Sequence, residues 1–254
     1  MSKKVLEVEG VSIGYGERTV LENVNFSLSA GSLAVIIGPN GSGKSTLLRA
    51  LTGENKGFTG NVLLSGESVK ELSQRNLARL RAVVATERNG GGALTVEETV
   101  SIGRFPYTGL LGTLGTEDKE AVRLAMANVG IADFANRFLG ELSDGERQKV
   151  MIARALAQET PLMFLDEPTS FLDVAARIET MRMLRRLADG GKTILLSTHD
   201  SAAALAVADT VLVLIPEERS VICGSKQEII AAGVLDRVFA RAGLRFDESA
   251  GDFR

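Results

Sequence analysis

Residues 33–46 read Leu33-Ala34-Val35-Ile36-Ile37-Gly38-Pro39-Asn40-Gly41-Ser42-Gly43-Lys44-Ser45-Thr46. The first five residues form a continuous apolar run, which is typical of a strand covered on both faces in a parallel sheet. The rest matches the phosphate-loop pattern G-x-x-x-x-G-K-[ST], placed as usual between a strand and a helix. Glycines let backbone N–H groups converge on phosphate oxygens, and the helix N-terminus adds partial positive charge. This segment therefore predicts a nucleotide-binding α/β core.

Two side chains of the loop have predicted roles of their own. We expect Lys44 to reach the β- and γ-phosphates and the Ser45 hydroxyl to coordinate Mg²⁺. The other residues from Gly38 to Thr46 would surround the phosphates, mainly through the backbone.

Further apolar runs at residues 82–85, 162–165, 193–196 and 211–214 have the same character and predict strands beside the first. Residues 5–15, 23–28 and 61–64 alternate more, which predicts a flanking antiparallel sheet. Helices are expected at residues 46–51, 117–129, 143–157 and 174–188, and another is expected to open at a capping box, Thr95 to Glu98. Residues 105–115 contain three glycines and predict an exposed loop.

These elements predict a single α/β domain over residues 1–254. Residues 1–89 and 158–224 would form the core with its antiparallel β-subdomain. Residues 90–157 would form an inserted α-helical subdomain, and residues 225–254 a C-terminal helical extension.

Composition excludes several classes of protein. The 254 residues carry 29 basic and 32 acidic side chains, a net charge of −3, which argues against a nucleic-acid partner. One cysteine, Cys223, and one histidine, His199, exclude an internal disulfide and a multi-histidine metal site. Mean hydropathy is +0.11, but the longest apolar runs, such as residues 202–208, are far shorter than a bilayer requires. A soluble, cytoplasmic chain is therefore expected.

The run at residues 162–165 ends in two carboxylates, Asp166 and Glu167. We expect Asp166 to face the magnesium ion and Glu167 to polarise the water that attacks the γ-phosphate. His199 follows another apolar run and could hydrogen-bond the γ-phosphate. Taken alone, each feature also fits a structural strand end or helix cap.

Leu142-Ser143-Asp144-Gly145-Glu146 resembles the LSGGQ signature of ATP-binding-cassette (ABC) ATPases. Ser170-Phe171-Leu172-Asp173 resembles the D-loop that follows the acidic pair in this family, and His199 resembles its switch histidine. Tyr15 resembles the aromatic residue that stacks on adenine. The motifs run in the family's order from Val5 to about Ala208, so the resemblance covers most of the chain.

This resemblance implies an ATPase with a P-loop NTPase fold that uses ATP and Mg²⁺, with Lys44, Glu167 and His199 as catalytic residues. In the family, the signature (here Ser143, Gly145 and Glu146) contacts the ATP bound by a second subunit. A homodimer would thus enclose two ATP molecules, with Asp173 in the dimer contact.

Residues 100–107 resemble a stretch of the importers of ferric siderophores, haem and cobalamin. The resemblance implies two copies of a separate transmembrane permease, an extracytoplasmic substrate-binding protein, and a peripheral location on the cytoplasmic face of the inner membrane.

The sequence departs from the family's pattern at three positions. Thr86 stands where a glutamine usually contacts Mg²⁺ and the membrane partner, so a Mg²⁺ contact by Thr86 is a hypothesis. Asp144 replaces a glycine of the signature and brings negative charge near a phosphate. Glu146 replaces the signature glutamine, and its position suits a capping box with Ser143.

Two alternatives stay open at this point. A non-transport ABC ATPase would act on the ribosome, DNA or a cluster-assembly scaffold, although such proteins usually carry a second cassette, zinc-ligand cysteines or a coiled-coil arm. A P-loop kinase would transfer phosphate to a metabolite and would not need residues 142–146.

Overall fold

The computed structural model describes residues 3–16, 18–85, 93–109, 112–239, 246–247 and 252–253. The strands are β1 (Lys4–Tyr15), β2 (Arg18–Ser29), β3 (Leu33–Ile37), β4 (Phe58–Leu64), β5 (Glu67–Ser68), β6 (Arg81–Val84), β7 (Leu162–Asp166), β8 (Thr193–Ser197), β9 (Thr210–Ile215), β10 (Ser220–Ser225), β11 (Phe246–Asp247) and β12 (Asp252–Phe253). The α-helices are α1 (Lys44–Leu51), α2 (Gln74–Leu80), α3 (Val96–Ser101), α4 (Thr116–Asn128), α5 (Asp144–Ala157), α6 (Val174–Asp189), α7 (Ser201–Val207), α8 (Lys226–Ala231) and α9 (Val234–Phe239). Short 3₁₀ turns lie at Ile102–Arg104, Ala132–Phe134 and Leu139–Glu141.

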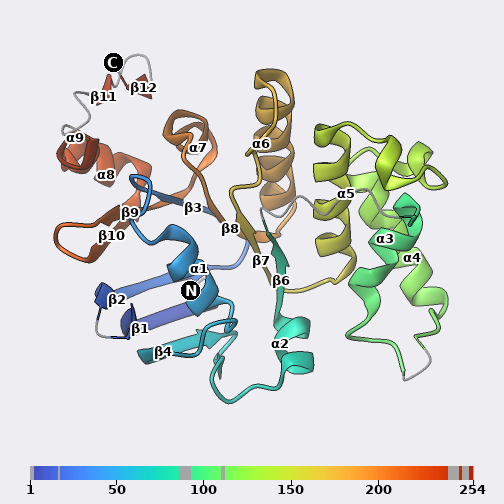
Figure 1. The fold of residues 1–254 in the computed structure, drawn as a ribbon, viewed down its shortest axis with the longest axis horizontal. Coiled ribbons are helices and arrows are strands. Elements are labelled where there is room, and N and C mark those ends of the chain that lie inside the picture. Colours follow the sequence, from blue (N-terminus) through green and yellow to red (C-terminus); the bar gives the residue numbers. More distant parts are fainter. Residues whose placement is uncertain are drawn as a thin grey trace.

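A six-stranded sheet of order β10-β9-β3-β8-β7-β6 forms the centre of the molecule (Figure 1). Its strands pair in parallel, except that β10 pairs antiparallel with β9 at the edge. Every residue of β3 and of β8 is buried, as expected for strands covered on both faces. The prediction of a mainly parallel α/β core is confirmed.

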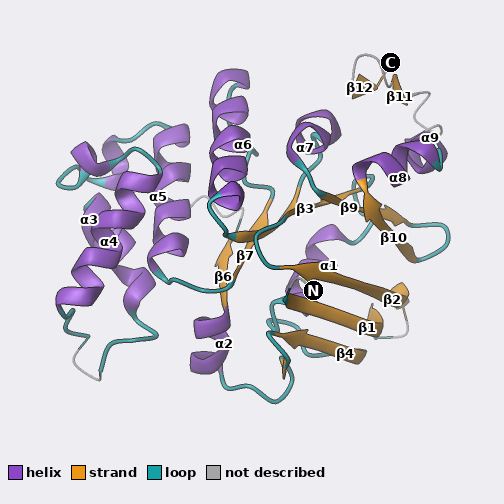
Figure 2. Cartoon of the chain, turned by 180° about the vertical axis from the view of Figure 1, so that it is seen from behind, coloured by secondary structure: helices purple, strands orange, loops and turns teal. Residues whose placement is uncertain are grey.

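Alternate residues of one strand face two different cores. Ala34 and Ile36 of β3 pack on one face, in a cluster that includes α1 and the antiparallel sheet. Val35 and Ile37 pack on the other face, in a cluster that includes α5, α6 and α7. Figure 2 shows these two layers on opposite sides of the central sheet.

The antiparallel sheet has the order β2-β1-β4-β5, which confirms the expected flanking sheet. β2 begins at Arg18, five positions before the predicted start at residue 23. The backbone N–H of Glu22 donates to the carbonyl of Arg219, 2.7 Å away, so β2 lies against the turn between β9 and β10.

Helices α3, α4 and α5 lie together at the end of the molecule opposite α8 and α9 (Figure 1). Both predicted capping boxes are present, between Thr95 and Glu98 at the start of α3 and between Ser143 and Glu146 at the start of α5. In each box the hydroxyl accepts from the glutamate N–H, while the carboxylate accepts from the N-cap N–H.

The segment after α3 is less exposed than predicted. Phe105 is exposed, but Thr108 is buried and the neighbouring Arg104 is 5% exposed. Two arginines of α2 hold this segment, because Arg75 Nη2 donates to the carbonyl of Thr108 (2.8 Å) and Arg79 Nη2 to that of Pro106 (3.1 Å). The prediction of a loop missed these contacts, since α2 itself was not predicted.

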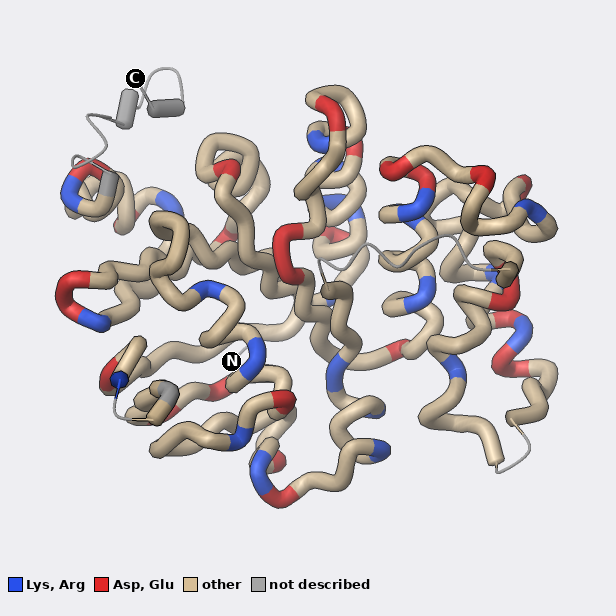
Figure 3. The backbone as a smooth tube through the Cα atoms, in the orientation of Figure 1, with Lys and Arg blue, Asp and Glu red and all other residues tan. Residues whose placement is uncertain are grey.

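Basic and acidic residues are interspersed along the described chain (Figure 3). Within the described ranges, no helix is both long enough and apolar enough to cross a membrane.

Candidate functional site

The phosphate loop joins the end of β3 to the start of α1, as the motif requires. Gly43 caps α1 with φ of 101°, and a Cβ there would lie 2.7 Å from Cγ1 of Val20. A side chain at this position would therefore clash with β2 as well as strain the backbone. The loop conformation thus depends on glycine for two separate reasons.

Lys44 is the first residue of α1 and is 6% exposed. Its Nζ donates to the carbonyls of Gly38 (2.8 Å) and Pro39 (3.1 Å), so the ammonium lies inside the curve of the loop. Burial lowers the pKa of Lys44, whereas Glu167 and Asp166 act in the opposite direction. The amine is close to two carboxylates and to the amides that would hold phosphate.

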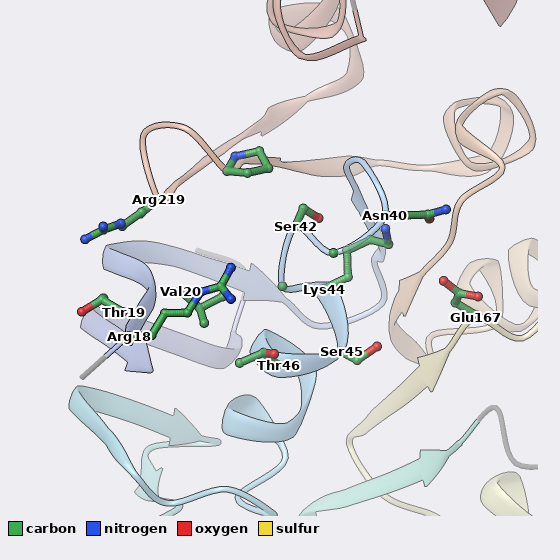
Figure 4. A pocket seen from close by; sticks show the side chains of 13 residues that line it. Arg18, Thr19, Val20, Asn40, Ser42, Lys44, Ser45, Thr46, Glu167 and Arg219 are labelled. Carbon is green, nitrogen blue, oxygen red and sulfur yellow. The ribbon is translucent and has the colours of Figure 1, made fainter. Parts of the chain in front are cut away.

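A cavity of about 630 Å³ opens above this loop (Figure 4). It is lined by residues 40–46 of the loop and α1, residues 18–20 of β2, Glu167, Pro216 and Arg219. The volume falls within the usual range for small-molecule sites. Sequence reasoning missed Arg18, Thr19, Val20, Pro216 and Arg219, because their positions depend on how β2 and the β9–β10 turn pack beside the loop.

Asp166 ends β7 beside the start of α1. Its Oδ1 accepts from Ser45 Oγ at 3.2 Å and from Ser197 Oγ at 2.6 Å. A carboxylate and a hydroxyl are the oxygen donors that Mg²⁺ prefers, and Mg²⁺ usually keeps few protein ligands beside phosphates and water. Among the described residues, no group of three or more His, Cys, Asp or Glu could hold a metal ion.

Glu167 follows directly and is held from several sides. Its backbone φ is 46°, a region that costs a non-glycine residue about 1–2 kcal/mol. Oε2 accepts from Ser170 Oγ at 2.8 Å and lies 3.4 Å from His199 Nδ1. The backbone N–H contacts both Oγ (3.0 Å) and the carbonyl (3.1 Å) of Ser197. The structure therefore brings the two predicted residues Glu167 and His199 together.

The signature residues lie elsewhere. Ser143 caps α5, and its Oγ donates to Glu146 Oε2 at 2.8 Å. That hydrogen bonding holds the pKa of Glu146 below its usual range, with the backbone N–H of Ser143 as the largest cause. Gly145 packs against α6, where a Cβ would lie 3.2 Å from that of Ala176. None of Ser143, Gly145 and Glu146 lines the cavity above the phosphate loop.

Three further predicted residues differ in how far the structure describes them. Asp173 caps α6, and its Oδ1 accepts from the backbone N–H of Ala176 at 2.7 Å. Tyr15 ends β1 and its backbone pairs with Arg18, but its side chain lies outside the described part. Thr86 lies outside the described residues altogether.

The sequence profile described as ABC transporter matches residues 21–170, more than half of the chain. The protein belongs to the ABC transporter family. It is therefore an ATPase, and its P-loop core is that of the family's ATP-binding domain.

Curated relatives of this ABC protein match along nearly all of its length. The iron(3+)-hydroxamate import ATP-binding protein of Bacillus subtilis is 37% identical over 92% of this chain and 87% of its own. The ferric enterobactin transport ATP-binding protein of Escherichia coli is 37% identical over 96% of this chain and 90% of its own. The cobalamin import ATP-binding protein of Halobacterium salinarum is 37% identical over 97% of this chain and 62% of its own.

Solved structures show the same fold. A structure reported as a metal-chelate type ABC transporter in an inward-facing conformation has a TM-score of 0.81 and 28% identity, covering 94% of this chain and 89% of that chain. An ATP-binding cassette of an ABC transporter in its ADP conformation has a TM-score of 0.82 and 25% identity. The match covers 93% of this chain and 97% of that chain.

Proposed function

We propose that this ATPase is the energy-coupling subunit of an importer, and that the cargo is a metal chelate of the siderophore, haem or cobalamin type. The observation that carries the proposal is that Ser45 and Glu167 line the cavity above the phosphate loop, with Asp166 in contact with Ser45 and His199 beside Glu167. The relatives that are named for hydroxamate, enterobactin and cobalamin import support the cargo class.

In the proposed nucleotide complex, the amides of residues 40–46 and the Lys44 ammonium hold the phosphates, and Tyr15 stacks on the adenine. Ser45 and Asp166 would hold Mg²⁺, with Thr86 as a further contact proposed from the family pattern alone. When bound, the ion neutralises charge that develops on the phosphate oxygens.

Glu167 accepts a hydrogen bond from the attacking water and takes its proton as the water oxygen bonds to the γ-phosphorus, while the bond from this phosphorus to the β–γ bridging oxygen breaks and ADP leaves. His199, with Nδ1 3.4 Å from Glu167 Oε2, keeps the carboxylate oriented and can contact the γ-phosphate. Positioning of this kind supplies much of the rate in phosphoryl transfer, because the transition state needs little covalent help from the protein.

We propose that the second half of each ATP site comes from another copy of the chain. The α5 N-terminus has N–H groups and a hydroxyl that suit a γ-phosphate, yet the signature does not line its own chain's cavity. A head-to-tail homodimer brings Ser143, Gly145 and Glu146 of one copy to the ATP of the other, with Asp173 in the contact. Two ATP molecules then close the dimer.

Closure and reopening would drive two copies of a transmembrane permease, with this chain peripheral on the cytoplasmic face of the membrane. An extracytoplasmic substrate-binding protein would deliver the chelate. Action on the ribosome, DNA or an assembly scaffold has no comparable support, because the curated relatives reported above are transport proteins.

The nucleotide site is tested with two variants. Glu167→Gln should keep ATP affinity but lose most hydrolysis, about 100-fold or more for a general base, and a stable ATP-bound dimer should accumulate in size-exclusion chromatography. Lys44→Ala should instead lose ATP binding, measured by equilibrium dialysis. Parent-rate turnover by Glu167→Gln would refute the proposed role of the carboxylate.

The importer assignment is tested by purifying the tagged chain from gently solubilised membranes and identifying its partners by mass spectrometry. A polytopic permease recovered near one to one, whose reconstituted complex takes up a ferric siderophore, haem or cobalamin, is the expected result. Ribosomal or DNA-repair proteins without a membrane partner would contradict it.

A further inference from the structure

Ser197 is the last residue of β8 and is fully buried beside the catalytic edge of the sheet. It stands in register with Asp166 on the neighbouring strand β7. We propose that Ser197 is a positioning residue for ATP hydrolysis, which fixes the Asp166 carboxylate and the Glu167 backbone through one hydroxyl. The inference rests on the proposed roles of Asp166 and Glu167 and adds a residue to them.

The hydrogen-bond geometry defines both contacts. Ser197 Oγ donates to Asp166 Oδ1 at 2.6 Å and accepts from the backbone N–H of Glu167 at 3.0 Å. A serine hydroxyl has one donor and two acceptor positions, so both bonds form at the same time. The bond to the carboxylate is short, as is typical of charge-assisted O–H···O⁻ contacts.

The contact to Asp166 is useful because Ser45 shares the same carboxylate oxygen. Ser45 Oγ donates to Oδ1 at 3.2 Å and is also the proposed hydroxyl ligand of Mg²⁺. A hydroxyl that binds a cation through its oxygen must reorient its proton. Ser197 supplies a donor to Oδ1 that is independent of this change, and it therefore keeps Asp166 in one orientation while metal is bound.

The contact to Glu167 supports an unfavourable backbone conformation. Glu167 has φ of 46°, and such residues persist when the surrounding structure holds them. The hydroxyl and the carbonyl of Ser197 both accept from its N–H. The backbone conformation of Glu167 fixes the direction in which its side chain leaves the main chain. Ser197 therefore also influences where the Glu167 carboxylate lies relative to the attacking water and His199.

Ser197 could instead have a purely structural role, in which its hydroxyl only completes the hydrogen bonding of the buried strand. Thr193 on the same strand is a matched control for that role. Thr193 opens β8, is equally buried, and its Oγ1 accepts from the backbone N–H of Gly31 at 3.0 Å. Thr193→Val removes a buried hydroxyl and an amide contact of similar geometry, but touches neither Asp166 nor Glu167.

The experiment compares Ser197→Ala, Ser197→Thr, Thr193→Val and Asp166→Asn in the full chain. Steady-state ATP hydrolysis gives kcat, and electron paramagnetic resonance of free Mn²⁺ gives metal affinity in the presence of a non-hydrolysable ATP analogue. We expect Ser197→Ala to lower kcat and weaken Mn²⁺ binding, each about tenfold, as for loss of a hydrogen bond to a charged group. Metal-free binding of the analogue should be unchanged.

Ser197→Thr keeps the hydroxyl and should recover most of both losses, whereas Thr193→Val should match the parent in both readouts. The inference is overturned if Ser197→Ala equals the parent in kcat and Mn²⁺ affinity, or if Thr193→Val reproduces its losses. A different failure would concern the proposed metal site itself: Asp166→Asn would then bind Mn²⁺ as the parent does.

Discussion

Gly43 shows how strongly a single position in the phosphate loop is constrained. Its φ of 101° is unfavourable for any side chain, and a Cβ would also come within 2.7 Å of Val20. These are separate costs: backbone strain of about 1–2 kcal/mol and overpacking of about 1–3 kcal/mol. The loop and β2 therefore determine each other's positions through this residue.

Gly43→Ala should lower the free energy of unfolding by about 2 kcal/mol or more, since both costs apply. Gly66→Ala is the control, because Gly66 has φ of 88° but nothing within 4 Å of an added Cβ. Urea denaturation of both variants measures the difference. Equal losses would show that the contact with Val20 carries no energy.

The residues that sequence could and could not predict differ in what fixes their place. Lys44, Ser45 and Asp166 lie at fixed offsets within local motifs, so their proximity followed once the phosphate loop and the strand end were identified. Ser197 meets Asp166 only because β8 pairs with β7, and strand order is a property of the whole sheet. The only signal in the sequence was a hydroxyl at the end of an apolar strand.

Among the elements, helix starts are well defined by chemistry in the local sequence. Three helices, α3, α5 and α8, begin with a Ser or Thr cap and a glutamate three residues on: Thr95 and Glu98, Ser143 and Glu146, Ser225 and Glu228. In each box the backbone N–H of the cap is the largest cause that lowers the glutamate pKa. These helix starts therefore depend on ionised carboxylates.

The lowered pKa values of these three glutamates predict that acid destabilises the fold. A glutamate with a lowered pKa in the folded state stabilises the fold above its unfolded value, about 4.3, and this contribution is lost as pH falls through the folded pKa. The triple variant Glu98→Gln, Glu146→Gln and Glu228→Gln should lose less unfolding free energy than the parent between about pH 5 and pH 3. Urea denaturation across that range measures both slopes; parallel slopes would contradict the assignment.

The elements that could be predicted are those whose burial produces a recognisable pattern of apolar residues in the sequence. β3 and β8 are buried on both faces and read as unbroken apolar runs. β10 is an edge strand in which every residue is of intermediate exposure, and its sequence of Ser, Val, Ile, Cys and Gly has no clear period. α2 has seven residues and only Leu77 buried, too short an apolar face for the helical period to be recognised.

Across the whole molecule, polar groups in and next to α2 add to the apolar packing between the helical part and the core. Arg75 and Arg79 donate to the carbonyls of Pro106 and Thr108. Gln158, just past α5, donates to the carbonyls of Ala78 and Arg81, the latter at 2.8 Å. These bonds tie the segment after α3 and the end of α5 to the edge of the central sheet.

Loss of these ties should loosen one region without unfolding the other. Arg75→Ala combined with Arg79→Ala should raise amide hydrogen exchange in residues 102–109, while α1 and β3 keep their protection. Arg123→Ala is the control, since its exposed pair with Glu120 lies within α4. Hydrogen exchange measured by mass spectrometry tests whether these hydrogen bonds hold the segment. Unchanged exchange in residues 102–109 would show that apolar packing alone holds it.

The alternation of side chains along β3 has an evolutionary consequence. The backbone of β3 separates the side chains that pack around the phosphate loop from those that pack around α5, the helix that begins at the signature. Ile36 packs with neighbours near α1 and Val35 packs beneath the helices, so a volume change at either residue is met first on its own face. Selection can therefore act on the packing of each face of β3 separately.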